Sequence, residues 1–141
     1  MTIDELLQER RIQRQKVAAA DITALISRAE ADIESARYML ARDPAWTFSI
    51  AYNGVLQVSR ALMFFHGFRP SSHESHKNTF AYLRVIIDED RKALVEYFDR
   101  MRTKRHQAVY EAPVRVTRTE AETLIEHAEI FINWVKEEVT G

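Results

Sequence analysis

The residues best suited to chemistry lie together between Asp99 and Tyr110, in the sequence Asp-Arg-Met-Arg-Thr-Lys-Arg-His-Gln-Ala-Val-Tyr. A helix, which turns about 100° per residue, places Arg102, His106 and Tyr110 on one face. An arginine guanidinium binds phosphate through paired donors and stabilises charge in a transition state. A histidine that titrates near neutral pH exchanges a proton with a ribose 2′-OH or a leaving oxygen. The set therefore suits phosphodiester chemistry without a metal.

Arg105 occupies a different face of the same predicted helix. It follows Met101 by four residues and precedes Ala108 by three, so it falls on the apolar stripe. A charged group in that position needs a partner or a water-filled cleft. Two interpretations stay open: Arg105 faces a phosphate-binding cleft, or it pairs with a buried carboxylate while His106 is merely exposed.

The overall charge gives no general attraction to nucleic acid, because 20 Lys and Arg are balanced by 21 Asp and Glu. The distribution is nevertheless uneven. Basic residues dominate one stretch that contains Arg100, Arg102, Lys104, Arg105, Arg115 and Arg118. This stretch is either a solvated face or a local phosphate-binding patch, in which Arg102 and Lys104 are the candidate phosphate contacts.

Two further groups of polar residues are candidates for binding. His73 and His76 have too few companions at zinc-ligand spacing, which favours loop or capping histidines. Asn53, Gln57 and Arg60 share one side of a predicted central helix, where they bond one another, contact a partner subunit or line a ligand cleft. In the cleft interpretation, Asn53 and Arg60 contact phosphate. The chain has no Cys and no Gly-rich phosphate loop, HExxH helix or nucleophile elbow, so we expect no metal and no cofactor.

The elements that must position these residues are predicted to be helices. Three Gly and three Pro are too few turn-formers for a sheet protein of 141 residues. Six helical segments are expected: 2–17, from 21 to Asp43-Pro44, 45–66, a short one around 80–87, 90–110, and one from 117 onward. The predicted N-terminal caps are Thr2 with Glu5, Asp21, Asp43, Ser71 or Ser75, and Thr117 with Glu120; Pro113 is expected to end the fifth helix.

Apolar side chains recur at helical spacing in these segments, which predicts how they pack. The segment 45–66 is apolar nearly all round, as in the central helix of a bundle. The last helix has the most regular stripe: Ala121, Leu124, Ile125, Ala128, Phe131, Ile132, Val135 and Val139. The fold is therefore expected to be all-α, an up-and-down bundle of four to five helices. Residues 1–141 should form one domain, in which 1–19 is a peripheral N-terminal helix.

No segment reads as a signal peptide or a membrane span. The N-terminus has charges where a signal peptide needs an apolar stretch, and Asn53, Gln57 and Arg60 interrupt the mostly apolar region 45–68. A cytoplasmic location without membrane contact is the expectation.

Two motifs resemble those of the HEPN domain family. The first runs Ala51-Tyr-Asn-Gly-Val-Leu-Gln-Val-Ser-Arg-Ala-Leu62 and continues as His66-Gly-Phe-Arg-Pro-Ser-Ser-His73; the second is Lys104-Arg-His-Gln-Ala-Val-Tyr110. The resemblance covers roughly residues 20–138. It implies a four- to five-helix bundle that forms a homodimer with a cleft along the two-fold axis. It also implies RNA or nucleotide as ligand.

The resemblance further implies a candidate active site, in two possible alignments. Many HEPN members are metal-independent RNases that use an Arg, four to six intervening residues and a His. Either Arg105 is the family arginine and Tyr110 stands at the histidine position, or Arg100 is the arginine and His106 completes the pair. Such RNases often act as toxins beside an MNT-type nucleotidyltransferase antitoxin, and a tyrosine in this region is adenylylated in some of them. Other members lack the catalytic pair and act as nucleotide-binding or accessory proteins.

Overall fold

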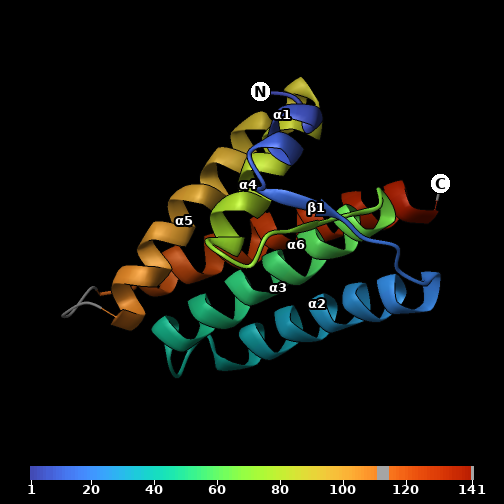
Figure 1. The fold of residues 1–141 in the computed structure, drawn as a ribbon. Helices are drawn as coiled ribbons and strands as arrows, with labels where there is room; N and C mark the ends of the chain where they lie inside the picture. The colour runs from blue at the N-terminus through green and yellow to red at the C-terminus, as the bar shows by residue number, and fades with distance from the viewer. Residues whose placement is uncertain (111–114, 141) are drawn as a thin grey trace.

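The computed structural model describes residues 1–110 and 115–140, and these form six α-helices, one of which is central to the bundle (Figure 1). The central helix is α3 (Pro44–Phe65), which contacts α2 (Ala19–Met39), α4 (Ser75–Ile86), α5 (Lys92–Tyr110) and α6 (Arg118–Thr140). A short α1 (Ile3–Gln8) and a 3₁₀ turn (Glu89–Arg91) complete the helical elements. The all-α prediction is confirmed. The structure adds a two-stranded sheet that the sequence did not predict.

Local sequence signals set the ends of α3. The Asp43 side chain accepts a hydrogen bond of 3.0 Å from the Trp46 N–H, and Pro44 occupies the first turn, where its missing N–H is harmless. Gly67 follows the helix with a φ of +89°, a conformation that other residues rarely adopt. The predicted limits of this helix are therefore confirmed within one residue at each end.

A glycine allows α2 and α3 to approach closely. A Cβ atom on Gly54 would lie 3.3 Å from both the Ala29 carbonyl oxygen and the Ile33 Cδ1. The first of these atoms is backbone and cannot move aside alone. Gly54 thus sets the spacing of the α2–α3 pair, against which α6 packs.

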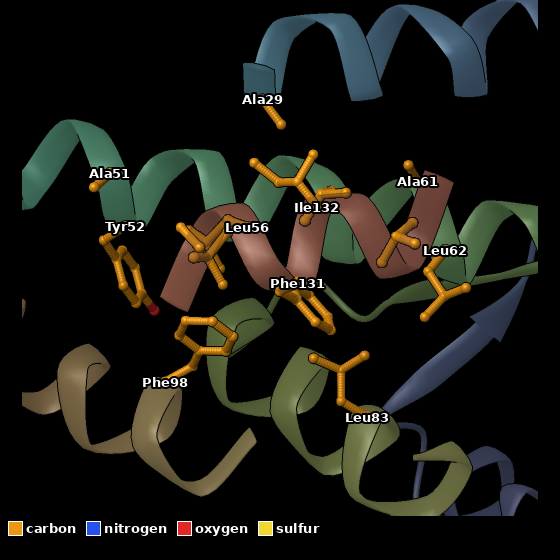
Figure 2. Close-up of a cluster of buried hydrophobic side chains, with 14 of the residues drawn as sticks. Ala29, Ala51, Tyr52, Leu56, Ala61, Leu62, Leu83, Phe98, Phe131 and Ile132 are labelled. Carbon is orange, nitrogen blue, oxygen red and sulfur yellow. The ribbon is translucent and has the colours of Figure 1, made fainter. Parts of the chain in front are cut away.

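The core is one cluster to which α2 to α6 contribute, and Figure 2 shows part of it, where α6 meets α3, α4 and α5. Phe131 from α6 and Phe98 from α5 are fully buried, with ring centroids 5.3 Å apart. Tyr52 and Leu56 of α3 and Leu83 of α4 surround them in Figure 2. Every residue of the predicted α6 stripe is buried except Val139, which is half-buried. The prediction of this face is confirmed.

The N-terminal segment departs from the prediction of one helix up to Val17. The Thr2 cap forms as expected and accepts from the Glu5 N–H at 3.2 Å, but α1 ends at Gln8. Arg10 then adopts a left-handed φ of 59°, and the chain continues as strand β1 (Ile12–Arg14). This strand pairs with β2 (Phe68–Pro70), antiparallel, with Gln13 opposite Arg69. The helix prediction was wrong: the left-handed Arg10 ends the helical path, and Ile12, at 1% exposed, is buried as part of the strand instead.

The other predicted caps divide into two groups. Thr117 and Glu120 form the expected reciprocal box at α6, with hydrogen bonds of 3.0 and 3.1 Å. Asp21 does not cap α2, which begins two residues earlier without a side-chain cap. Neither predicted serine caps α4. Ser71 instead donates its hydroxyl to the Arg10 carbonyl and so ties the loop to the N-terminal segment. Pro113 lies outside the described residues.

The sequence predicted no membrane-spanning segment, and the hydropathy of the helices agrees with this. Among residues 1–110 and 115–140, none of the helices combines the length and the apolar character that crossing a bilayer requires.

Candidate functional site

Arg105 lies on the inner side of α5 and reaches toward α3. Its guanidinium carbon sits 5.4 Å from the centre of the Tyr52 ring, a cation–π arrangement. Its Nε atom is buried and has no hydrogen-bond partner among the described residues, and no carboxylate of that set pairs with it. The expectation that Arg105 falls on the inward stripe is confirmed. A buried donor of this kind calls for a ligand, ion or water.

Tyr52 and His76 bring α3 and α4 to the same place. Tyr52 is fully buried, and its hydroxyl lies 3.5 Å from His76 Nδ1. Burial raises the pKa of Tyr52 well above its usual range. Burial also lowers the pKa of His76, and the positive charges of Arg105, Arg102 and Arg60 lower it further. Burial and the arginines of two neighbouring helices therefore favour the neutral form of His76.

Arg102 is directed by a small ionic network on α4 and α5. Its Nε donates to Asp99 at 2.7 Å, and Asp99 also accepts a hydrogen bond from Arg84. Burial raises the pKa of Asp99, but the hydrogen bonds from Arg84 and Arg102 outweigh it, so the carboxyl pKa lies below its usual range. Arg84 also donates to Glu96 at 2.6 Å. The network leaves Arg102 close enough to Tyr52 and His76 to affect the pKa of both.

Two of the predicted basic residues lie on other sides of α5. Arg100 is exposed and lies near Tyr97. Burial raises the pKa of Tyr97 to about 12, although the positive charge of Arg100 acts to lower it. Lys104 turns toward α6 and forms an ion pair with Glu120. The structure thus brings Arg102 and Arg105 together and separates Arg100 and Lys104 from them.

His106 and Tyr110 form a second, outer face of the helix. Both are exposed, Tyr110 at 69%, and their ring centroids lie 5.0 Å apart. The predicted alignment of these two rings is confirmed. Arg102, predicted on the same face, is instead directed by Asp99 toward Tyr52 and His76. Arg105 and His106, being adjacent, point in directions about 100° apart. Within one chain, the inner arginine and the outer histidine do not face the same atom.

Arg102, Arg105, Tyr52 and His76 together are called the Arg105 cluster below. Beside it, a pocket of about 350 Å³ opens between α3, α4 and β2. Asn53, Gln57 and Arg60 line its α3 wall, so the predicted common side of these residues is confirmed. Asn53 also donates to Asp32 of α2 at 3.0 Å. The remaining polar residues of the lining are Arg69, Ser72, Ser75, His76 and Thr79. No carboxylate lines this pocket among the described residues.

Sequence reasoning missed three members of this region: Tyr52, Arg69 and His76. Tyr52 belongs to the predicted central helix, which is apolar nearly all round, and His76 was expected to be a loop or capping histidine. Their meeting depends on how α4 folds back on α3, which no local pattern encodes. Within the part of the chain that the structure describes, no three His, Asp or Glu side chains gather closely enough to hold a metal ion.

Comparisons with known proteins agree with this architecture. The model of the HEPN domain family matches residues 22–138. No curated protein sequence matches the chain. The matched region contains α3 to α5 and most of α2 and α6, and leaves α1 and β1 outside.

Proposed function

Because this chain belongs to the HEPN family of nucleotide-binding and RNase domains, we propose that it binds the phosphates of RNA or nucleotides. The binding surface is the inner side of α5 together with the facing parts of α3 and α4. Arg102 and Arg105 contact phosphate there, and Arg60 and Asn53 extend the surface along α3.

The observation that carries this proposal is the state of the Arg105 side chain. A guanidinium half-buried over Tyr52, with its Nε unpartnered among the described residues, retains unused donors and an uncompensated charge. A phosphate oxygen supplies both the acceptor and the negative charge. The neighbouring Arg102 is already engaged by Asp99, so Arg105 contributes the larger share of the binding free energy.

The proposal predicts that Arg105→Gln weakens RNA binding by about 10- to 100-fold, because a hydrogen bond to a charged group contributes about 1.5–3 kcal/mol. The slope of log Kd against log salt should also fall by about one unit, since one phosphate contact is lost. Fluorescence anisotropy with a labelled single-stranded RNA at several salt concentrations measures both quantities.

Lys92→Ala is the matched control for this experiment. It removes one positive charge from the same helix, about 20 Å along the axis from Arg105, and Lys92 pairs only with Glu89 among the described residues. Equal losses in the two variants would show a diffuse charge effect and contradict a site at Arg105. No salt-sensitive binding by the wild type would contradict the proposed function itself.

RNA cleavage without a metal is the second candidate function, and the exposure of His106 favours it. His106 has an open approach from solvent and lies one residue from Arg105. In this scheme His106 accepts the 2′-OH proton and the 2′-oxygen attacks phosphorus. The bond from phosphorus to the 5′-oxygen of the next nucleotide breaks, this oxygen takes a proton from water, and a 2′,3′-cyclic phosphate is left. Arg105, or Arg100 in the other alignment, stabilises the charge on the phosphate.

Because Arg105 and His106 of one chain point in different directions, cleavage by this pair would need residues from two chains. We propose that two copies of the chain meet along α5 in a homodimer, so that the outer His106 of one copy faces the inner Arg105 of the other. If the chain is a monomer, the non-catalytic alternative is favoured, in which it acts as a nucleotide-binding or accessory protein. The molar mass from light scattering distinguishes the two.

Tyr110 offers a test of the nucleotidyltransferase partner. Its side chain is 69% exposed at the end of α5, which leaves the hydroxyl open to a modifying enzyme. Coexpression with an MNT-type nucleotidyltransferase should add AMP to this chain, and Tyr110→Phe should abolish the addition; intact-mass spectrometry measures both. Tyr38→Phe is the control, because Tyr38 is 88% exposed on α2. Undiminished AMP addition in the Tyr110 variant would contradict the assignment.

A further inference from the structure

The pocket between α3, α4 and β2 carries two arginines whose charges are not neutralised by any described carboxylate. Arg60 lines the α3 wall, and its guanidinium carbon lies 6.0 Å from the centre of the Phe64 ring. Arg69 enters from β2 and donates to the neutral side chain of Gln13. The pocket therefore concentrates positive charge in a concave space of about 350 Å³, which is within the range of small-molecule sites.

Arg69 is held in this pocket by the N-terminal strand. Gln13 lies directly opposite Arg69 in the β1–β2 pair, and its amide oxygen accepts the hydrogen bond from the guanidinium. The buried Ile12, opposite Pro70, anchors the strand. Residues 12–14 lie outside the region 22–138 that matches the family. A segment beyond the family region thus orients one of the two charged groups.

The first turn of α4 adds donors to the same wall. The α4 helix has 12 residues and begins at Ser75, while its N-cap, Glu74, makes no side-chain capping bond. The first N–H groups of the helix are therefore left without a side-chain acceptor, beside the pocket-lining Ser75 and His76. Such groups stabilise an anion bound at the start of a helix, and here they supplement the two arginines.

From this arrangement we propose that the pocket binds the terminal phosphate of a nucleotide or of an RNA strand, with Arg60 and Arg69 as the charged groups that recognise it. A terminal phosphate carries nearly two negative charges and three free oxygens at neutral pH, which matches two arginines and the N–H groups of one helix end. An internal phosphodiester carries one charge and continues as chain on both sides. This inference rests on the proposed function and deepens it: the Arg105 surface contacts the body of the ligand, and the pocket receives its end.

His76 links the pocket to the Arg105 cluster. Its ring lines the pocket, its Nδ1 lies 3.5 Å from the Tyr52 hydroxyl, and Nε2 has no partner among the described residues. The charged groups that act on it are Arg60 from α3 and Arg102 and Arg105 from α5. A dianion bound here would offset these positive charges. The pKa of His76 would then rise, and binding would be accompanied by proton uptake.

The test uses ligands that differ only in the terminal phosphate. Isothermal titration calorimetry compares 5′-AMP and 3′-AMP with adenosine, and one RNA oligonucleotide carrying a 5′-phosphate, a 3′-phosphate or neither. At least one phosphorylated form should bind the wild type about tenfold more tightly than its unphosphorylated counterpart. Arg60→Gln and Arg69→Gln should each remove most of this preference. Lys92→Ala should leave the preference intact.

Gln13→Ala tests the contribution of the N-terminal strand. As a positioning residue, Gln13 should affect the phosphate preference by a few-fold without lowering the midpoint of thermal unfolding, because its side chain is exposed. At pH 7, titrations in two buffers of different ionisation enthalpy should show proton uptake by the wild type that His76→Gln reduces. Equal proton uptake in both proteins would overturn the role of His76.

The outcomes separate this inference from the proposed function. RNA binding without any preference for a terminal phosphate would overturn the pocket assignment and leave the Arg105 surface standing. Binding of AMP but not of unphosphorylated RNA would support the pocket and contradict the RNA-binding surface. A preference that survives in both Arg60→Gln and Arg69→Gln would locate the phosphate elsewhere and overturn the inference.

Discussion

Replacing His106 with alanine is expected to lower the rate of metal-free RNA cleavage by about 10²- to 10⁴-fold, the usual contribution of a general acid or base. The imidazole of His106 is exposed on the outer face of α5, where it can exchange a proton with bound RNA. Cleavage of a fluorophore–quencher RNA in the presence of EDTA measures the rate.

His73→Ala is the matched control, because His73 is also exposed and lies in the loop before α4. It should cleave like the wild type when purified in the same way. Loss of cleavage in the His106 variant alone would then exclude a contaminating nuclease. Comparable cleavage by the His106 variant would remove His106 from the mechanism. If RNA binds but no protein cleaves it, the non-catalytic alternative is favoured and the Arg105 surface is unaffected.

Phe131→Ala should lower the free energy of unfolding by about 3–5 kcal/mol, the range for a buried phenylalanine replaced by alanine. Phe131 is fully buried, with ring centroids 5.3 Å from Phe98 and 5.8 Å from Trp134. The cavity would open where α6 meets α5 (Figure 2). Thermal unfolding followed by circular dichroism should show a midpoint lowered by about 10–20 °C.

The neighbouring Ile130 provides the control for this prediction. It is 59% exposed on the outer face of α6, so Ile130→Ala should change the free energy of unfolding by about 0.5 kcal/mol or less. Equal destabilisation by the two variants would mean that α6 does not bury the Phe131 face. The helix would then have to pack differently from the arrangement described above.

The helices could be predicted from the sequence because their signals are local. The α6 stripe repeats at three and four residues, and the Thr117–Glu120 box marks its start within one turn. The inward direction of Arg105 followed from the same periodicity, as did the meeting of the His106 and Tyr110 rings. Each of these features depends only on residues within one helix.

The remaining features depend on residues that are distant in the sequence. The β1–β2 pair joins Ile12 to Pro70, and three residues of strand have no periodicity long enough to recognise. His76 meets Tyr52 only because α4 folds back along α3. Lys104 appeared to belong with Arg105, yet Glu120 of α6 lies within its reach. In each case tertiary contacts decided what the local pattern left open.

The position of β1 outside the matched region has a consequence for how this protein is dissected. A chain trimmed to residues 22–138 would retain α3 to α5 and most of α6, but β2 would lose β1, the strand it pairs with in the described part of the chain. The unpaired N–H and C=O groups of that edge would then be free to recruit strands from other molecules. Self-association of such a fragment would reflect the exposed edge rather than the assembly of the intact chain.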